Sequence, residues 1–174
     1  MDTDSKLIKK MRQGDDTAVD LFVQKYYSDI LRYCSYHCPD RGYAEDLTQD
    51  TFVRFFENFG EYSHVGKAKN YLYVIAGNLC RNYYRGLREI PDSQSIESET
   101  GRGSENGTEI VEQIAIQQAL DALPDELREV IILYYYQDLK QKEIAEILGI
   151  GVPLVKYRLK RAKQELESCL GWEA

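Results

Sequence analysis

Two stretches of the sequence combine several cationic side chains with no acidic one. Residues 67–88 contain five Lys or Arg, residues 153–163 contain another five, and neither stretch contains Asp or Glu. Lysine and arginine bind the phosphates of nucleic acids, and arginine and glutamine also hydrogen-bond to base edges. The net charge of the whole chain, −7, argues against a nucleic-acid binder. However, the local fields around such stretches, and not the total charge, decide where a polyanion binds. The pattern predicts two separate sites for DNA.

The second cationic stretch falls in a helix-turn-helix pattern. A short helix over 140–148 is predicted to end at Gly149, and a longer helix over 152–169 follows after a tight turn. At 100° per residue, the face of the longer helix opposite its apolar residues is polar and cationic and could enter a major groove. That face consists of Pro153, Lys156, Tyr157, Lys160, Arg161 and Gln164. A solvated basic face on a structural helix is the alternative interpretation.

The first cationic stretch has the periodicity of an amphipathic helix over 66–88, with tyrosines beside its cations. Phosphate-binding cations next to aromatic rings that can stack on bases are suited to single-stranded or opening DNA. The polar face contains Lys67, Asn70, Val74, Asn78, Arg81, Arg85 and Arg88, flanked by Tyr71, Tyr73 and Tyr84. The residues alone leave open a structural helix whose arginines are solvated and whose tyrosines pack into the core.

A third amphipathic helix, over 41–59, has an acidic face with an apolar spot. Such a face repels DNA and suits a protein partner with basic residues, although a solvated acidic surface fits the residues as well. The face consists of Asp46, Gln49, Asp50, Val53 and Glu57, with Phe56 nearby.

Helical periodicity is common in the chain and strand signals are nearly absent, which predicts an all-α fold. Residues 90–108 are rich in Ser, Gly, Glu and Thr and are typical of a flexible linker. The linker separates a helical N-terminal domain, 1–89, from a C-terminal domain, 109–174, that contains the helix-turn-helix. We expect helices over 4–13, 17–37, 41–59, 66–88, 109–121, 124–136, 140–148 and 152–169, with Asp16 or Thr17 capping the second.

Other classes of protein are less compatible with the sequence. No phosphate loop, nucleophile motif or metal-binding carboxylate set occurs, so we expect no enzyme and no cofactor. No apolar run is long enough to span a membrane and the N-terminus lacks a signal peptide, which predicts a cytoplasmic protein without membrane insertion. A metal or redox sensor built on Cys34, His37 and Cys38 is one alternative. A response-regulator output domain is another, although no receiver domain with alternating strands is evident.

Three motifs in order resemble the extracytoplasmic-function (ECF) sigma factors, the smallest members of the sigma-70 family. AEDLTQDTF resembles the family's polymerase-binding helix, and NYLYVIAGNLCRNYYR is similar to the helix that recognises and opens the −10 element. ALDALPDELREVIIL and EIAEILGIGVPLVKYRLKRAKQEL together resemble the −35-binding domain. The resemblance covers nearly the whole chain outside the linker and implies a non-catalytic factor that directs RNA polymerase to promoters and assists DNA opening.

The resemblance also implies partners and residue roles. Asp46, Gln49, Asp50 and Val53 would bind core RNA polymerase at the β′ clamp helices, and the protein would also contact the β flap. The −10 DNA would meet Lys67, Asn70, Tyr71, Asn78, Arg81, Asn82, Arg85 and Arg88. The −35 DNA would meet Pro153, Lys156, Tyr157, Lys160, Arg161 and Gln164. Many members of the family are held inactive by an anti-sigma factor, which would be a further partner.

Several residues depart from the family pattern. Tyr71 stands where Trp is usual and keeps an aromatic surface, whereas Asn82 replaces the usual Asp and removes a negative charge beside DNA. Pro153, Leu154 and Tyr157 replace the common Gly, Thr and Ser of the recognition helix. These changes affect which −35 sequence would be read.

Overall fold

The computed structural model describes residues 3–89 and 107–171, with side chains placed up to residue 86 in the first range. Every regular element in these ranges is helical, which confirms the all-α prediction. The chain divides into two compact units, Met1–Glu99 and Thr100–Ala174, here called unit 1 and unit 2. The predicted linker, 90–108, lies outside the described residues except for 107 and 108, which begin a helix of unit 2.

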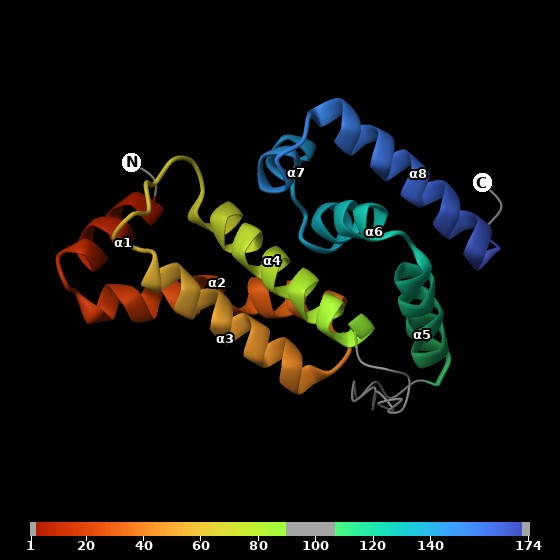
Figure 1. The fold of residues 1–174 in the computed structure, drawn as a ribbon, viewed down its shortest axis with the longest axis horizontal. Coiled ribbons are helices and arrows are strands. Elements are labelled where there is room, and N and C mark those ends of the chain that lie inside the picture. The colour runs from red at the N-terminus through yellow and green to blue at the C-terminus, as the bar shows by residue number, and fades with distance from the viewer. Residues whose placement is uncertain (1–2, 90–106, 172–174) are drawn as a thin grey trace. The chain divides into compact units, whose positions relative to one another are not determined.

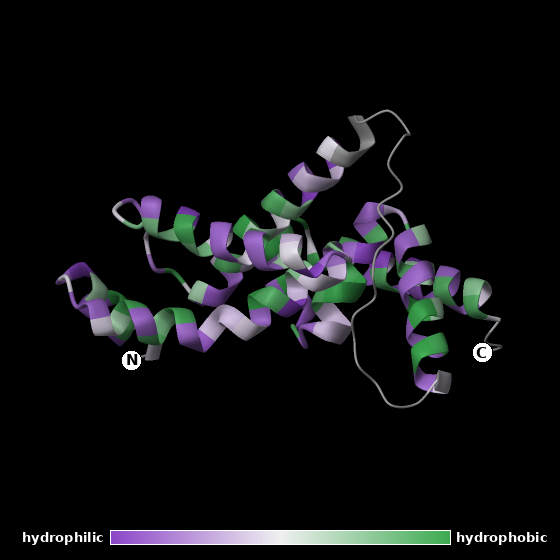
Figure 2. Cartoon of the chain, turned by 90° about the horizontal axis from the view of Figure 1, so that it is seen from below, coloured by the Kyte–Doolittle hydropathy of each residue, from purple (hydrophilic) through white to green (hydrophobic). Residues whose placement is uncertain are grey.

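Unit 1 is built around one long helix. Helix α2 (Asp16–His37) contacts α1 (Thr3–Arg12), α3 (Arg41–Glu57) and α4 (Ala68–Glu89), and α3 also packs on α4 (Figure 1). Hydrophobic and hydrophilic residues alternate at helical spacing along these helices (Figure 2), so each buries one face. The largest fully buried side chains of unit 1 are Tyr33, Tyr73, Phe22, Phe55, Ile30 and Leu72.

Aromatic rings fill much of this core. The Phe22 and Phe55 rings stack with centroids 4.9 Å apart, which joins α2 to α3. Tyr33 meets Tyr73 edge-to-face at 5.3 Å, which joins α2 to α4. The prediction that Tyr73 flanks the basic face of α4 is therefore wrong. Its ring is fully buried, because it lies on the side of α4 that packs against α2.

Two of the helix starts that differ from the predicted ones have clear local reasons. Asp15, and not Asp16 or Thr17, caps α2, since its carboxylate accepts a hydrogen bond from the Ala18 N–H at 3.3 Å. Helix α4 begins at Ala68 instead of residue 66. Gly66 has φ +86°, a left-handed conformation that glycine adopts without strain but that cannot continue into a right-handed helix.

One glycine of α4 is required by close packing. A Cβ atom at Gly77 would lie 2.9 Å from the Tyr33 hydroxyl oxygen, and Tyr33 is fully buried and cannot swing away. Gly77→Ala is therefore expected to lower the free energy of unfolding by about 1–2 kcal/mol, the usual scale for overpacking. Gly86→Ala is the control, because a Cβ atom there would meet nothing within 4 Å and alanine favours helix by up to about 1 kcal/mol. Denaturant unfolding should move the two midpoints in opposite directions, and a stabilised Gly77→Ala protein would contradict the packing argument.

Helix α1 is fixed to unit 1 by a buried carboxylate. Asp4 is 3% exposed and accepts hydrogen bonds from the Tyr26 hydroxyl at 2.6 Å and the Lys25 ammonium at 2.6 Å. Burial alone would raise the pKa of Asp4, but these bonds, the Lys25 charge and the Ala68 N–H together hold the pKa below its ordinary value of 3.8. The ionised carboxylate therefore stabilises the folded state.

The lowered pKa of Asp4 predicts how stability responds to acid. A group whose pKa is lower in the folded than in the unfolded state stabilises the fold above its unfolded pKa, and that contribution disappears as pH falls through the folded pKa. The stability difference between the wild type and Asp4→Asn should thus be largest above about pH 5 and shrink on acidification below the ordinary pKa. Denaturant unfolding at a series of pH values measures this, and a difference that grew toward acid would contradict it.

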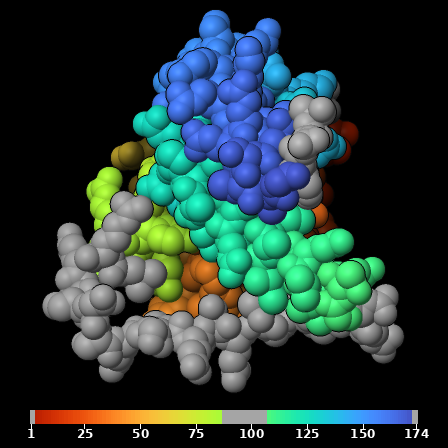
Figure 3. All heavy atoms as spheres, turned by 90° about the vertical axis from the view of Figure 1, so that its right-hand side faces the viewer, coloured from red at the N-terminus to blue at the C-terminus, as the bar shows by residue number. Residues whose placement is uncertain are grey.

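Unit 2 surrounds a smaller aliphatic core. Helix α8 (Val152–Leu170) contacts α5 (Gly107–Ala122), α6 (Asp125–Ile131) and α7 (Gln141–Leu148). Figure 3 shows the side chains of α8, in blue, against those of the preceding helices. One buried cluster consists of Leu120, Leu123, Leu127, Ile131 and Ala162.

The predicted helix over 124–136 is not a single α-helix. Pro124 precedes α6, and α6 passes into a π-helical turn, η1 (Ile132–Tyr136), in which the Gln137 N–H donates to the Ile132 carbonyl. The wider turn accompanies burial of both Ile132 and Leu133, while Tyr135 is left on the surface.

Candidate polymerase and nucleic-acid interfaces

The acidic face of α3 is exposed along its length. Residues 46, 50, 53 and 57 follow helical steps of four, three and four, and all are exposed together with Gln49. The opposite side of α3 is anchored in the core by Ala44 and Phe55, and the buried Thr48 and Thr51 hydroxyls donate to backbone carbonyls one turn back at 2.7 Å each. The acidic face can therefore be engaged without disturbing the fold.

The electrostatics of this face favour a cationic partner. Arg41 pairs with Glu45 at 3.2 Å on the neighbouring turn, but within the described residues no ion pair occupies Asp46 or Asp50. Val53 is 52% exposed between the carboxylates and Glu57. We call Asp46, Gln49, Asp50 and Val53 the acidic strip; it offers two solvated negative charges around an apolar contact.

The basic face of α4 points away from the unit 1 core for most of its length. Asn78, Arg81, Asn82 and Arg85 are exposed, and the Arg81 guanidinium donates to the Asn78 side chain one turn back. On the opposite side Leu72, Ala76 and Leu79 are buried. The side chain of Arg88 lies outside the described part of the structure. The arrangement presents guanidinium and amide groups on one surface.

The first turn of α4 is more closely integrated with the fold than the sequence suggested. Tyr71 is 36% exposed, and its ring stacks on Tyr62 with centroids 5.1 Å apart. Asn70 is half-buried, and its Oδ1 atom is buried without a hydrogen-bond partner among the described residues. Lys67, just before the helix, is exposed. Tyr62 was not singled out from the sequence, because its role arises from contact with residues distant in the chain.

The predicted −35 face of α8 is fully exposed. Helix α7 ends at Gly149, whose φ of +64° confirms the predicted left-handed position, and Gly151 precedes α8. Val155 and Ala162 are completely buried, so α8 is held by one face and presents the other to solvent. The exposed residues of that face are Pro153, Lys156, Tyr157, Lys160, Arg161 and Gln164.

Cations of α8 divide between the exposed face and the fold. Arg161 donates to the Tyr157 hydroxyl and to Glu165, both at 3.1 Å, which raises the guanidinium pKa and orders the exposed face. Arg158 points to the other side, where it pairs with Glu126 of α6 at 3.2 Å and is only 17% exposed. Of the five cations in residues 153–163, Arg158 thus stabilises the packing of α8 on α6 and is not part of the exposed face.

The alternative metal site does not assemble. The Cys34 thiol hydrogen-bonds with Cys80 and Thr48, which lowers its pKa, and the Cys38 thiol donates to the Asp40 carbonyl at 3.6 Å. His37 packs against the Tyr33 ring, with centroids 4.5 Å apart. Among the described residues, no group of three His, Cys, Asp or Glu side chains could hold a metal ion.

No described helix has the length and apolarity required to cross a membrane.

Comparison with known proteins supplies a family for this arrangement. Residues 22–90 match the family model of sigma-70 region 2, and residues 113–166 match that of sigma-70 region 4. The chain is 31% identical to the ECF RNA polymerase sigma factor SigM of Bacillus subtilis over 86% of this chain and 93% of that protein.

Two solved structures share the fold. The structure of CnrH in complex with the cytosolic domain of CnrY matches with a TM-score of 0.78 at 22% identity, and the match covers 99% of this chain and 100% of the matched chain. The sigma factor RpoE, in complex with the anti-sigma factor NepR from Bartonella quintana, matches with a TM-score of 0.75 at 23% identity. This match covers 90% of this chain and 98% of the matched chain.

Proposed function

Because the chain belongs to the sigma-70 family as an ECF RNA polymerase sigma factor, we propose specific roles for its three exposed faces. The family is not enzymatic, so function depends on which surfaces hold polymerase and promoter DNA. The N-terminal domain, 1–89, binds core polymerase and the −10 element, the segment 90–108 connects the domains, and the C-terminal domain, 109–174, binds the −35 element. One observation carries this proposal: one acidic and two basic faces, on three different helices, are exposed while the opposite face of each is buried.

The acidic strip of α3 binds core polymerase at the β′ clamp helices. Asp46 and Asp50 lie one turn apart and exposed, so both carboxylates can meet cations on one partner helix. Val53 supplies apolar contact area that is solvated in the free protein. A second contact, between the C-terminal domain and the β flap, follows from the family and not from a particular residue here.

The basic face of α4 binds −10 DNA as it opens. Arg81 and Arg85 contact backbone phosphates, and Tyr71, with a third of its surface exposed, offers a ring on which a base can stack. Base–aromatic stacking and phosphate contacts offset the unstacking cost, which is about a few kcal/mol for an extruded base. Lys67, Asn70, Asn78, Asn82 and Arg88 complete the proposed −10 set.

The exposed face of α8 binds the −35 element in its duplex form. Its cations and Gln164 lie on the side of α8 opposite the buried Val155 and Ala162, as a recognition helix in a major groove requires. Arg161 is ordered by Tyr157 and Glu165, which reduces the entropy lost when the guanidinium binds a base or phosphate.

Run-off transcription tests the whole proposal. Purified core polymerase is incubated with genomic DNA fragments, with and without this chain. We expect new, discrete start sites only when the chain is present, and alignment of the upstream sequences gives the −10 and −35 elements. Transcripts unchanged by the chain, with active core and no inhibitor present, would contradict the proposal.

An anti-sigma factor is the proposed regulatory partner. The chain shares its fold with RpoE, whose structure was determined in complex with the anti-sigma factor NepR. Such a partner would block transcription by covering the acidic strip, the basic faces or both. Adding a candidate anti-sigma factor before core polymerase should abolish the discrete start sites, whereas adding it after promoter opening should have a smaller effect.

A further inference from the structure

Helix α1 makes one contact with the segment that precedes the basic helix and another with the first residue of that helix. This segment, residues 58–67, joins α3 to α4 and is here called the connector. Arg12, at the end of α1, reaches the middle of the connector, and Asp4, near the start of α1, reaches Ala68, the residue that directly follows the connector. Neither residue is part of the three proposed interfaces, so their contacts require a separate explanation.

Asp4 joins three helices through one buried carboxylate. Its oxygens accept hydrogen bonds from the Tyr26 hydroxyl and the Lys25 ammonium of α2, at 2.6 Å each. The same carboxylate accepts a hydrogen bond from the backbone N–H of Ala68, the first residue of α4. A carboxylate at a helix start satisfies an otherwise unpaired N–H and interacts favourably with the helix dipole. Asp4 therefore sets where α4 begins relative to α1 and α2.

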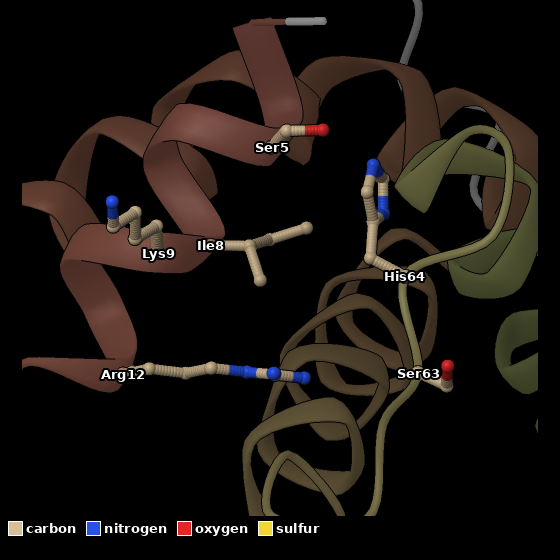
Figure 4. A pocket seen from close by; sticks show the side chains of 6 residues that line it. All are labelled: Ser5, Ile8, Lys9, Arg12, Ser63 and His64. Carbon is tan, nitrogen blue, oxygen red and sulfur yellow. The ribbon is translucent and has the colours of Figure 1, made fainter. Parts of the chain in front are cut away.

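Arg12 holds the middle of the connector. Its guanidinium donates to the backbone carbonyl of Tyr62 and lies over the Phe59 ring, 5.9 Å from the ring centroid. Figure 4 shows Arg12 extending from α1 toward the part of the connector that contains Ser63 and His64. Ile8 and Arg12 of α1 line a hollow of about 380 Å³ together with Ser63 and His64 of the connector.

Tyr62 connects the Arg12 contact to Tyr71, which flanks the basic face of α4. Its ring is 9% exposed and stacks on Tyr71, and its hydroxyl shares a hydrogen bond with His64 Nδ1 at 3.0 Å. Burial, with the Asp4 charge, raises the pKa of Tyr62 to about 12, so the hydroxyl stays neutral at physiological pH. Tyr62 therefore contacts Arg12 through its backbone carbonyl and Tyr71 through its ring.

We propose that α1 is a brace that holds the connector and the first turn of α4 in the geometry that binds opened −10 DNA, with Asp4 and Arg12 as its positioning residues. The inference rests on the proposed −10 role of Tyr71 and its neighbours. Groups already held in their bound geometry lose less entropy when DNA binds, and a loose supporting shell weakens a site whose contact residues are intact. The brace therefore acts on DNA opening and leaves the acidic strip unaffected.

The test compares Asp4→Asn and Arg12→Gln with Ile8→Val in the full chain assembled with core polymerase. Ile8→Val removes one methylene from the same buried side of α1 and leaves both polar contacts in place. Affinity for core polymerase and the fluorescence of 2-aminopurine in the −10 strand are measured for each. The two polar variants should lower the open-complex fraction about tenfold at unchanged core affinity, the scale of one lost charge-assisted hydrogen bond. Ile8→Val should change neither.

Hydrogen exchange provides a readout that general destabilisation would not reproduce. Asp4→Asn should accelerate amide exchange at Ala68 and in the connector selectively, while amides of α3 keep the protection seen in Ile8→Val. A double-mutant cycle between Arg12→Gln and Tyr71→Ala should be non-additive, because the proposed effect of Arg12 passes through Tyr71.

The outcomes separate this inference from the function on which it rests. If Tyr71→Ala lowers opening but the two polar variants behave like Ile8→Val in opening and in exchange, the brace is refuted and the −10 assignment stands. If Tyr71→Ala and the polar variants all leave opening unchanged, both fail. If the polar variants lower opening and core affinity equally, α1 has a general structural role and the brace is refuted as well.

Discussion

Replacing Asp46 and Asp50 with lysine should weaken binding to core RNA polymerase by about 100-fold or more, since loss of a close charge pair at an interface costs about 2–5 kcal/mol. Both carboxylates are exposed on one face of α3, one helical turn apart. Reversing them replaces attraction to a cationic partner with repulsion at two adjacent points. Because the opposite face of α3 supplies the core contacts, the fold of unit 1 should be retained.

The measurement is a titration of labelled chain with core polymerase at two salt concentrations. Wild-type affinity should fall as salt rises, and the variant should show a weaker salt response. Asp16→Lys with Asp20→Lys is the matched control, since these exposed carboxylates of α2 have the same spacing and change net charge by the same amount. Equal losses in both double variants would mean that net charge, and not the acidic strip, determines binding. The α3 variant should still bind duplex −35 DNA through its C-terminal domain as well as the wild type does.

Removing the cations from the exposed face of α8 should produce the second large effect. The triple variant Lys156→Ala, Lys160→Ala and Arg161→Ala should reduce promoter binding by holoenzyme by about 100-fold or more at physiological salt. If each cation neutralises one phosphate, the slope of log affinity against log salt should become less steep by about 2.7. Promoter fragments found by run-off transcription are the appropriate DNA.

Two further variants distinguish the kinds of contact on α8. Arg158→Ala removes a cation from the same helix, but its guanidinium faces Glu126 and the fold, so the salt slope should not change. Arg161→Lys keeps the charge and loses the planar guanidinium, so it should keep the slope and relax discrimination at any guanine that Arg161 reads. A slope that changed as much with Arg158→Ala as with one exposed cation would contradict the proposed face.

The two faces proposed to bind DNA differ in how much they depend on the rest of the fold. The α8 face consists of residues from one helix held by a compact set of apolar contacts, and its members reach solvent independently. The start of the α4 face depends on the connector, on Tyr62 and on contacts from α1. We therefore expect substitutions outside the interface to affect DNA opening more than duplex recognition.

The sequence alone was sufficient to predict the helical class, the acidic strip and the exposed face of α8. These features repeat at three- and four-residue steps within one segment, so local periodicity determines which side of each helix is buried. The left-handed end of α7 at Gly149 was predictable for the same local reason. Tyr73 shows where periodicity fails, because it lies between the two faces of α4 and only the position of α2 decides that it is buried.

Tertiary structure alone decided the contacts between residues distant in the chain. Asp4 and Arg12 occur in a short polar helix whose pattern gives no reason to select them, and the stacking of Tyr62 on Tyr71 depends on the path of the connector. Arg158 lies in the sequence among other cations, yet its side chain forms an ion pair with Glu126 of another helix and packs into the fold. Periodicity reports which face of a helix is buried, whereas the partner of a side chain depends on how the helices pack against one another.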